Sequence, residues 1–317
     1  MKRSSRNPII TRQDIISDLE ALRDVSSVFN PGAAVFKENI LLLLRVQNRA
    51  RETFLVKAES EDGYSFNISE SPVEFIGLDN QSDRSIYHIY DPRISQIEEK
   101  YYILCAMDTS EGCFLGLFET DDFEHLHFQG YVSEPDVRNG VLFPEKINGF
   151  YYRLERPNRC LLDNGPKTGS TITVSRSADM LKWERISDLF SGRPHYWDEL
   201  IGSGPPPIKT RKGWLHIYHG VATHFASSNI YQAGYCLLDL NQPEKVIKRE
   251  KYNILEPREL YELTGQVPNV VFPSGMIALE YDQEGFINEN GRILIYYGAA
   301  DTVVALAETT LNDILKL

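Results

Sequence analysis

The feature that most constrains the fold is an internal repeat of about 60 residues. Four similar stretches place an aspartate in a short polar segment: Asp62 in SEDGYSF, Asp122 in TDDFEHL, Asp179 in SADMLKW and, more loosely, Asp239 in LLDLNQP. These aspartates are separated by 60, 57 and 60 residues. An aspartate among turn-forming neighbours is typical of a hairpin between two strands. A regular period of this length indicates a chain built from copies of one supersecondary unit.

A second pattern lies upstream of these turns and consists of a short strand, a turn and an apolar strand. It recurs in residues 30–46, 90–107, 140–156, 201–220 and 269–301. The second strand of each copy is rich in Tyr, Ile and Leu, as expected for a β-strand. Five copies of about four short strands predict an all-β fold, a five-bladed β-propeller forming a single domain over residues 1–317. A β-sandwich with insertions is the alternative, and the regular step does not favour it.

The N-terminal segment TRQDIISDLEALR (11–23) is an exception to the strand patterns. It predicts a short helix, because Thr11 and Asp14 resemble a capping box and an apolar stripe follows it. The stripe contains Ile15, Ile16, Leu19 and Leu22. We therefore expect residues 1–25 to be an extension that packs on the outside of the propeller. The oligomeric state stays open, with this helix as a candidate interface element of a homo-oligomer.

The charge and the cysteines limit the classes of partner. A net charge of −12 argues against a nucleic-acid or membrane-surface partner, since both require a basic face. An anionic ligand would need a local pocket of arginine and histidine. The four cysteines have neither metal-type spacing nor the density of a disulfide framework, and we expect no metal site. The sequence shows no signal peptide and no apolar run near 18 residues, which predicts a cytoplasmic protein.

Polar residues recur where the predicted blades meet the central axis. The heads of the first strands carry Asn30, Asp91, Asn139 and Asn269, and the ends of the second strands carry Arg45, Arg156, His219 and Asp301. Since the first strands of a propeller line its central channel, these side chains are expected to converge in one funnel. The alternative for Asp91, which precedes a proline, is that it caps a turn or pairs with Arg93.

Several motifs resemble glycoside hydrolase family 130, the β-mannoside phosphorylases and related β-mannosidases. They are VFNPGAAV, YDPRI, RNGVLFPEKINGFY, IGSGPPPIKTRKGWLHIYHGV, GYCLLDLNQPEKVI, VPNVVFPSGM and IYYGAADTVVALA, spread over residues 28–307 in the family's order. The resemblance implies a five-bladed propeller with Asp91 as the single catalytic acid, whose proton travels through the mannose 3-hydroxyl. It implies that phosphate is held by Arg138, Arg156 and His219, with Tyr231 as a further contact. The mannosyl unit would be held by Asn30, Arg45 and Asp301, and we add Arg93 to this substrate-binding set.

The resemblance implies an inverting phosphorylase that needs no cofactor and takes a small oligosaccharide with inorganic phosphate as co-substrate. The products would be α-mannose 1-phosphate and a shortened sugar. A β-mannosidase is the first alternative, but a hydrolase needs a second carboxylate as base. The segment HGVATHFASSNIYQAG (219–234), where such a base could stand, contains no Asp or Glu. The second alternative is a non-catalytic carbohydrate-binding propeller.

Some assignments stay open in the sequence. Either Arg49 or Arg51 contacts the sugar, and Trp197 is a candidate for stacking on it. Arg153 is the alternative to Arg156, because the two side chains alternate along one strand. The acceptor would meet residues 161–171 and 223–231, and the linkage (β-1,4 or β-1,2) and the acceptor sugar (glucose or mannose) are not determined.

Overall fold

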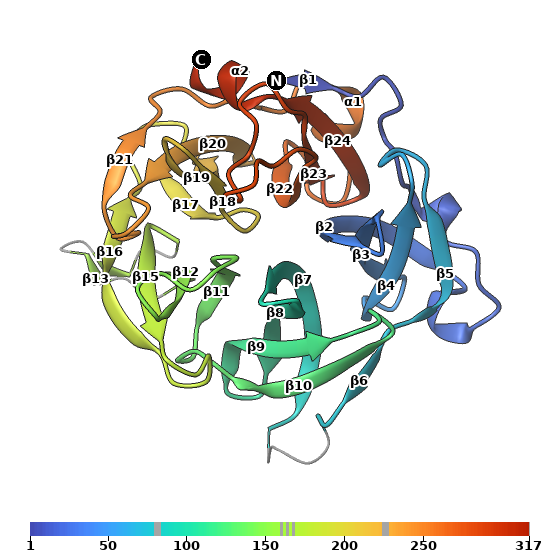
Figure 1. Cartoon of the computed structure of the whole chain (residues 1–317). Helices are drawn as coiled ribbons and strands as arrows, with labels where there is room; N and C mark the ends of the chain where they lie inside the picture. Colours follow the sequence, from blue (N-terminus) through green and yellow to red (C-terminus); the bar gives the residue numbers. More distant parts are fainter. Residues whose placement is uncertain (79–83, 159–160, 163–164, 167–168, 224–227, 317) are drawn as a thin grey trace.

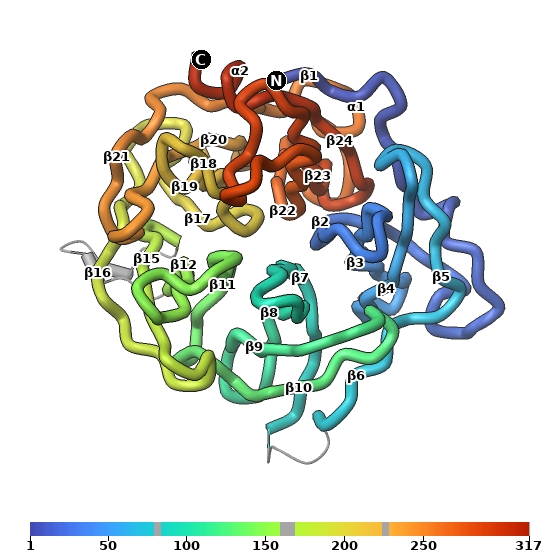
Figure 2. Tube along the Cα trace, in the orientation of Figure 1, coloured from blue at the N-terminus to red at the C-terminus, as the bar shows by residue number. Residues whose placement is uncertain are grey.

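Five twisted sheets stand around a common axis as the blades of a propeller (Figure 1). The computed structural model describes residues 1–317 except 79–83, 159–160, 163–164, 167–168, 224–227 and 317. The chain passes from blade to blade in sequence order, and the two termini lie close together in the same blade (Figure 2). The predicted all-β five-bladed propeller is therefore confirmed.

Each blade is built from consecutive strands, with the innermost strand first. Blade 1 contains β2 (Val25–Phe36), β3 (Asn39–Asn48), β4 (Thr53–Ser60) and β5 (Asn67–Pro72). Blade 2 contains β7 (Ile86–Ile97), β8 (Lys100–Thr109), β9 (Gly112–Thr120), β10 (His125–Tyr131) and the outer β6 (Glu74–Ile76). Blade 3 contains β11 (Val137–Leu142), β12 (Tyr151–Pro157), β15 (Thr171–Ser177) and β16 (Glu184–Ser191), with the small hairpin β13 (Leu161–Leu162) and β14 (Gly165–Pro166).

The last two blades are built in the same way, and the chain also contains a few short helices. Blade 4 contains β17 (Leu200–Ser203), β18 (Ile208–Thr210), β19 (Gly213–Ala222), β20 (Ile230–Leu238) and β21 (Val246–Arg249). Blade 5 contains β22 (Val271–Ala278), β23 (Ile293–Ala299), β24 (Val303–Thr309) and β1 (Lys2–Arg3). The helices are α1 (Leu260–Leu263) and α2 (Leu311–Leu315), with 3-10 turns at Arg12–Asp14 and Glu20–Leu22. None of the described helices is both long and apolar enough to cross a lipid bilayer.

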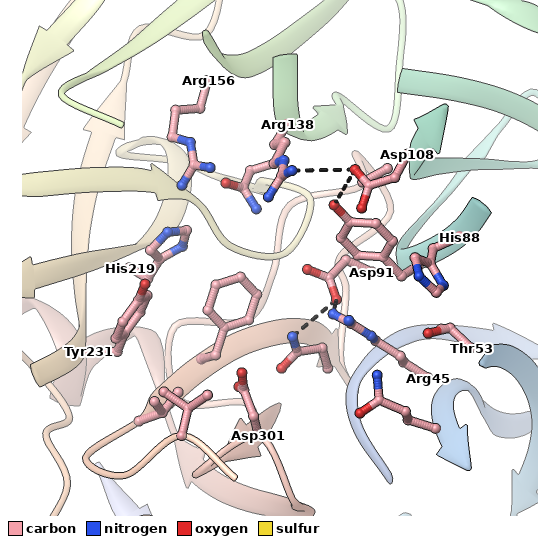
Figure 3. Close-up of a pocket in the computed structure, with 18 of the residues that line it drawn as sticks. Arg45, Thr53, His88, Asp91, Asp108, Arg138, Arg156, His219, Tyr231 and Asp301 are labelled. Carbon is pink, nitrogen blue, oxygen red and sulfur yellow. Dashed lines mark hydrogen bonds and ion pairs between the residues drawn. The ribbon is translucent and has the colours of Figure 1, made fainter. Parts of the chain in front are cut away.

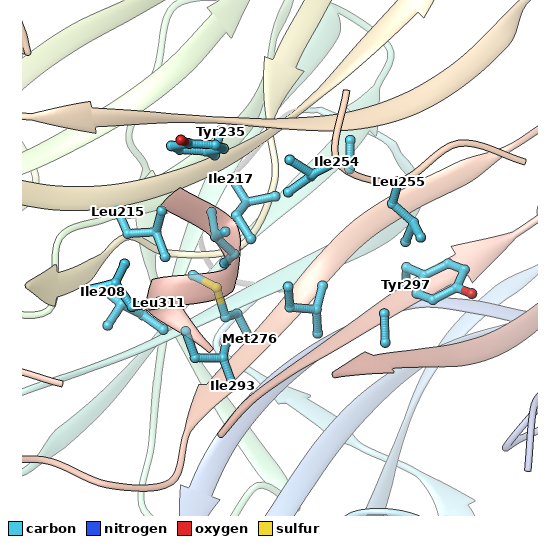
Figure 4. Packing of buried hydrophobic residues seen from close by; sticks show 14 of the residues in the cluster. Ile208, Leu215, Ile217, Tyr235, Ile254, Leu255, Met276, Ile293, Tyr297 and Leu311 are labelled. Carbon is cyan, nitrogen blue, oxygen red and sulfur yellow. The ribbon is translucent and has the colours of Figure 1, made fainter. Parts of the chain in front are cut away.

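The core consists of wedges of apolar side chains between neighbouring blades. The run ILLLL of β3 shows why, because alternate residues face opposite sides of a sheet. Leu41 and Leu43 pack towards blade 2, whereas Leu42 and Leu44 pack towards blade 5. A continuous apolar run is expected of a strand that is buried on both faces. Figure 4 shows the corresponding wedge between blades 4 and 5, which α2 completes with Leu311.

The repeated aspartates form the turns between the third and fourth strands of four blades. Each Oδ1 accepts hydrogen bonds from two backbone N–H groups two and three residues further on. The donors are Tyr64 and Ser65 for Asp62, Glu124 and His125 for Asp122, Leu181 and Lys182 for Asp179, and Asn241 and Gln242 for Asp239. This is the turn geometry that an Asp side chain stabilises. The period in the sequence is thus the period of one blade-forming turn.

The N-terminus closes the ring by adding β1 to the outer edge of blade 5. Lys2 pairs with Glu308 and Arg3 with Ala307. The side chain of Asn7 continues this pairing, because its Nδ2 donates to the Leu306 carbonyl at 2.9 Å and its Oδ1 accepts from the Leu306 N–H at 2.8 Å. The first residues of the chain therefore take part in the last blade.

The predicted helix over residues 11–23 is wrong. Two 3-10 turns occupy its ends, and Ile15 and Leu19 have extended backbone. Of the predicted stripe, Ile15 and Leu22 are buried, whereas Ile16 is 76% exposed. Ser17 Oγ accepts a hydrogen bond from the Leu19 N–H, a local bond that competes with helix formation. A short helix depends on a packed apolar face, and here only Ile15 and Leu22 pack, in the apolar cluster between blades 1 and 5.

Candidate active site

A cavity of about 400 Å³ opens at one end of the propeller axis, and all five blades contribute to its walls. We call this cavity the funnel. Its polar lining residues are Asn30, Arg45, Gln47, Arg51, Thr53, His88, Tyr90, Asp91, Asp108, Arg138, Asn139, Arg156, His219, Tyr231 and Asp301. Such a convergence of polar groups from distant positions is typical of an active or binding site.

Asp91 sits in the middle of β7, at a bulge and not at the head of the strand. The pairing with β8 shifts register between Tyr90 and Arg93, and Asp91 has a φ of 54°. Asn30 and Asn139 occupy equivalent bulges in β2 and β11, with φ values of 46° and 51°. Asn and Asp tolerate this left-handed conformation better than other non-glycine residues. The bulges turn all three side chains into the funnel.

The carboxylate of Asp91 is held by two donors from blade 1. Asn30 Nδ2 lies 3.0 Å and Arg45 Nη1 2.8 Å from Asp91 Oδ1 (Figure 3). Both bonds end on the same oxygen, and no described residue donates a hydrogen bond to Oδ2. The Arg45 guanidinium is itself fixed between the rings of Phe29 and Tyr90, at 4.4 and 4.5 Å from their centroids. Asp91 thus has one anchored oxygen and one available for chemistry.

Two carboxylates of the funnel have opposite pKa shifts. Burial favours the neutral form of Asp91, but the charges of Arg45 and Arg93 and the bonds from Asn30 and Arg45 outweigh it and lower its pKa. Asp301 lies in the tight turn between β23 and β24. Burial, followed by the negative charge of Asp91, raises the pKa of Asp301 to about 6. Asp91 is therefore the more acidic of the two groups.

The wall formed by blades 3 and 4 carries an arginine pair. Arg138 Nη2 donates to Asp108 Oδ1 at 3.3 Å, and Arg156 Nη2 donates to Asn158 Oδ1 at 3.0 Å. The Nε of each arginine is buried and has no described partner. Burial and then the charge of Arg138 lower the pKa of Arg156. Two guanidinium groups that repel each other and keep unfilled donors form a site for an anion.

His219 completes this wall but adds no charge to it. Its ring lies 4.5 Å from the Phe272 centroid and 6.1 Å from that of Tyr231. Burial and then the nearby Arg156 hold its pKa well below the usual value, so the imidazole is neutral. Both ring nitrogens are without a described partner. This wall therefore combines the two charged arginines with a neutral histidine that has one N–H to donate.

The other predicted residues divide into two groups. Arg45, Tyr231 and Asp301 line the funnel together with Asn30, whereas Arg93 does not. Arg93 is buried beneath Asp91, where its Nε donates to the Gly204 carbonyl at 2.8 Å and its Nη1 lies 3.2 Å from the carbonyls of Asp91 and Pro92. The structure therefore places Arg93 under the site and not on its surface.

The structure also places the residues that were left open. Arg51 lines the funnel, while the exposed Arg49 pairs with Asp24 away from it. Trp197 stacks on Tyr218 and donates to the Lys251 carbonyl, so it belongs to the packing of blade 4. Arg153 lies in a second cavity, paired with Glu155. Asn269 bonds Ser228 and is not part of the lining. Much of the predicted acceptor region, at 163–164, 167–168 and 224–227, lies outside the described residues.

Five further polar residues that the sequence did not single out also line the funnel: Gln47, Thr53, His88, Tyr90 and Asp108. A signal for Asp108 was present, because it stands near the end of the second strand of blade 2, as Arg45, Arg156 and His219 do in their blades. Tyr90 and His88 precede Asp91 on β7, where an aromatic strand residue is indistinguishable from core. Among the described residues, no group of three or more His, Cys, Asp or Glu could hold a metal ion.

Comparisons with known proteins show relatives that match nearly the whole chain. A family model, described as beta-1,4-mannooligosaccharide phosphorylase of the glycoside hydrolase family 130, matches residues 1–317. The beta-1,4-mannooligosaccharide phosphorylase of Ruminococcus albus is 31% identical over 99% of this chain and 89% of its own length. The 4-O-beta-D-mannosyl-D-glucose phosphorylase of Bacteroides fragilis is 26% identical over 98% of this chain and 81% of its own. The solved complex of the Listeria innocua beta-1,2-mannobiose phosphorylase with beta-1,2-mannobiose superposes with a TM-score of 0.84 at 30% identity, covering 99% of this chain and 98% of that one.

Proposed function

The chain belongs to glycoside hydrolase family 130, and we propose from this premise that its funnel phosphorolyses β-mannosides. The reaction takes a β-mannoside and inorganic phosphate and gives α-mannose 1-phosphate and a shortened sugar. The observation that carries this assignment is the arginine pair, Arg138 and Arg156, facing the same cavity as the anchored carboxylate of Asp91. This arrangement suits an anionic nucleophile and a single acid.

Phosphate needs positioning more than activation. It is already an anion, and a guanidinium offers a planar fork that matches two of its oxygens. Arg138 and Arg156 supply the charge, and neutral His219 and the Tyr231 hydroxyl supply hydrogen bonds. An anion held beneath the anomeric carbon reacts as in a unimolecular step. Attack from the face opposite the leaving group inverts the configuration at that carbon.

Asp91 is the proposed source of the proton that reaches the departing oxygen by way of the mannose 3-hydroxyl. In the unliganded funnel its pKa is lowered, so the group is ionised at neutral pH. A bound phosphate adds negative charge to the funnel, which favours protonation of Asp91. Proton uptake is therefore tied to loading of the site. Asn30 and Arg45 keep Asp91 oriented, and Asp301, Thr53 and His88 are placed to meet sugar hydroxyls.

Hydrolysis would need a base to activate water. Besides Asp91, the carboxylates described in the funnel are Asp108 and Asp301. Asp108 Oδ1 already accepts hydrogen bonds from Tyr90 and Arg138, and the raised pKa of Asp301 leaves it partly protonated near pH 6. Neither is an unengaged carboxylate next to the arginine pair. The geometry thus favours phosphate over water.

We propose short β-mannosides as the substrates. The relatives above are named for three different linkages or acceptors, so similarity alone does not choose among them. The decisive experiment incubates the protein with β-1,2-mannobiose, β-1,4-mannobiose and β-1,4-mannosyl-glucose, with and without phosphate. We expect mannose 1-phosphate to form from at least one of them, and only when phosphate is present.

The matched variant for this assay is Asp91→Asn, which keeps the size of the side chain and its carbonyl oxygen. Loss of the acid should lower kcat about 10²- to 10⁴-fold. Phosphate-independent release of mannose would assign the funnel to a hydrolase. Binding of mannosides without any turnover, together with an Asp91→Asn protein that behaves like the wild type, would assign it to a non-catalytic propeller.

A further inference from the structure

We propose that Asp108 is a positioning residue that fixes both halves of the active site, the anion-binding Arg138 and the Arg45–Asp91 pair. The inference rests on the proposed function, because it concerns how the same funnel is held in its working geometry. Asp108 lies near the end of β8, and its backbone pairs with His88 of β7. It therefore stands between the acid strand of blade 2 and the arginine wall of blade 3.

One carboxylate oxygen of Asp108 accepts hydrogen bonds from both sides of the site. The Tyr90 hydroxyl donates to Oδ1 at 3.0 Å, and Arg138 Nη2 donates to the same atom at 3.3 Å (Figure 3). Burial, the first of several causes, raises the pKa of Tyr90, so its hydroxyl keeps the proton that it donates. Asp108 thereby ties a residue of the acid side to a residue of the phosphate side.

On the phosphate side, Asp108 sets the direction of a long side chain. Arg138 is partly exposed, and its buried Nε has no described partner. A guanidinium has five N–H donors, so the contact with Asp108 uses one and leaves others for an anion. Without Asp108, the Arg138 side chain would have to be ordered when phosphate binds, which costs affinity.

On the acid side, Asp108 acts through Tyr90. The ring of Tyr90 is buried and forms one face of the slot that holds the Arg45 guanidinium, with Phe29 as the other face. Arg45 in turn donates to Asp91 at 2.8 Å. Anchoring the Tyr90 hydroxyl to Asp108 prevents the ring from shifting, so the position of Asp91 depends on a carboxylate that does not touch it.

The charge of Asp108 gives the proposal a sharp test, because charge and position have opposite effects. A negative charge beside Arg138 repels phosphate. If charge were its main effect, removing the carboxylate would lower the KM for phosphate. If Asp108 positions Arg138, removing it raises that KM.

The experiment compares Asp108→Ala, Asp108→Asn and Tyr90→Phe in steady-state phosphorolysis, with Asp24→Ala as the control. Asp24 is an exposed carboxylate that pairs with Arg49 outside the funnel. For Asp108→Ala we expect the KM for phosphate to rise about tenfold or more and kcat to fall as well, since charged hydrogen bonds are lost on both sides. The amide oxygen of Asp108→Asn can still accept both bonds, so this variant should regain most of the phosphate affinity.

Tyr90→Phe separates the two halves. It keeps the ring on Arg45 and removes the hydroxyl, so kcat should fall while the KM for phosphate stays within about twofold of the wild type. In the double variant Asp108→Ala/Tyr90→Phe, kcat should be no lower than in Asp108→Ala alone, because both changes remove the same hydrogen bond.

An unchanged or lowered KM for phosphate in Asp108→Ala overturns the proposal, as does additive loss of kcat in the double variant. If Asp108→Ala does not fold, the proposal is judged from Asp108→Asn and Tyr90→Phe. Equal effects of Tyr90→Phe on kcat and on the KM for phosphate then count against the proposal. A wild-type protein without phosphate-dependent turnover would instead refute the proposed function, so the two failures are distinguishable.

Discussion

At the scale of single residues, the funnel separates two carboxylates by their surroundings. The pKa of Asp91 is lowered against its burial by Arg45, Arg93 and Asn30, while that of Asp301 is raised by burial and by Asp91 itself. In the proposed function, Asp91 takes up a proton when phosphate binds, and Asp301 accepts hydrogen bonds from the sugar once it is ionised.

The raised pKa of Asp301 predicts how kcat/KM for the mannoside falls at acidic pH. Its pKa of about 6 means that the protonated form dominates below that pH. If the carboxylate binds sugar hydroxyls, kcat/KM for the mannoside should fall as the pH drops through about 6, and Asp301→Asn should have a lower value without this limb. The measurement is kcat/KM from pH 5 to 8 for both proteins. The same limb in Asp301→Asn would assign it to another group.

The same residue predicts a gain in stability on mutation. A carboxyl whose folded pKa is raised above its ordinary 3.8 favours the fold at low pH, and this contribution is lost as the pH rises through about 6. At pH 7 the ionised, partly buried Asp301 therefore opposes folding. We expect Asp301→Asn to raise the free energy of unfolding at pH 7 by about 1–3 kcal/mol and to have little effect at pH 4. Denaturant unfolding at the two pH values tests this, and a loss of stability at pH 7 would contradict it.

At the scale of elements, Asp and Asn residues have two separate uses in this chain. At the bulges of the inner strands, Asn30, Asp91 and Asn139 adopt positive φ and turn into the funnel. In the outer turns, the repeated aspartates accept two backbone N–H bonds. These bonds favour the ionised side chain, and they contribute to the lowered pKa values of Asp62 and Asp122. The same residue type thus serves the site in one place and the backbone in the other.

The turn between β9 and β10 offers a matched test, because two aspartates are adjacent in it. Asp122 Oδ1 accepts from the N–H groups of Glu124 and His125, both at 2.8 Å, whereas Asp121 is exposed at the same turn. We expect Asp122→Ala to lower the free energy of unfolding by about 1–2 kcal/mol. Asp121→Ala should change it by less than about 0.5 kcal/mol. Thermal unfolding of both variants decides, and equal effects would argue against the turn as the cause.

At the scale of the whole molecule, a partly buried ion pair joins the start of the chain to the segment that precedes blade 5. Arg3 donates from Nε to Glu262 Oε1 at 2.7 Å and from Nη2 to Oε2 at 2.9 Å. Glu262 lies within α1 and is fully buried. Its Oε1 also accepts a hydrogen bond from the Tyr297 hydroxyl of blade 5. The pair thereby ties the first residues of the chain to α1 and to blade 5.

The contact between Arg3 and Glu262, which we call the clasp, predicts that the protein loses stability in acid. Although burial favours its neutral form, the bonds from Arg3 and from the backbone lower the pKa of Glu262 below its ordinary 4.5. Its contribution is therefore complete above pH 4.5 and is lost as the pH falls towards the folded pKa. Glu262→Gln should lower the free energy of unfolding at pH 7 by about 3 kcal/mol, because it leaves Arg3 without its charge partner. The difference from the wild type should shrink below pH 4.5.

The control for the clasp is Arg6→Ala, which removes an exposed pair with Asp62. Exposed pairs contribute little, so we expect a change below about 1 kcal/mol. Denaturant unfolding of both variants at pH 7 and pH 4 completes the test. A Glu262→Gln protein as stable as the wild type at pH 7 would show that the ring closes without the clasp.

Features that recur from blade to blade could be predicted from the sequence because they repeat. The period of the turn aspartates and the apolar second strands predicted five blades, and the polar slots at the strand ends predicted that Arg45, Arg156, His219 and Asp301 would meet. Contacts between blades could not be predicted from the sequence, since they depend on how the apolar side chains between neighbouring blades pack. Tertiary packing alone decided that residues 11–23 would form two 3-10 turns and not a helix, and that Arg93 would lie beneath the site. It also decided that burial would keep His219 neutral and that Asp108 would join two blades. A sequence pattern records the backbone that each residue can adopt, whereas charge, burial and partners arise only when distant strands are brought around one axis.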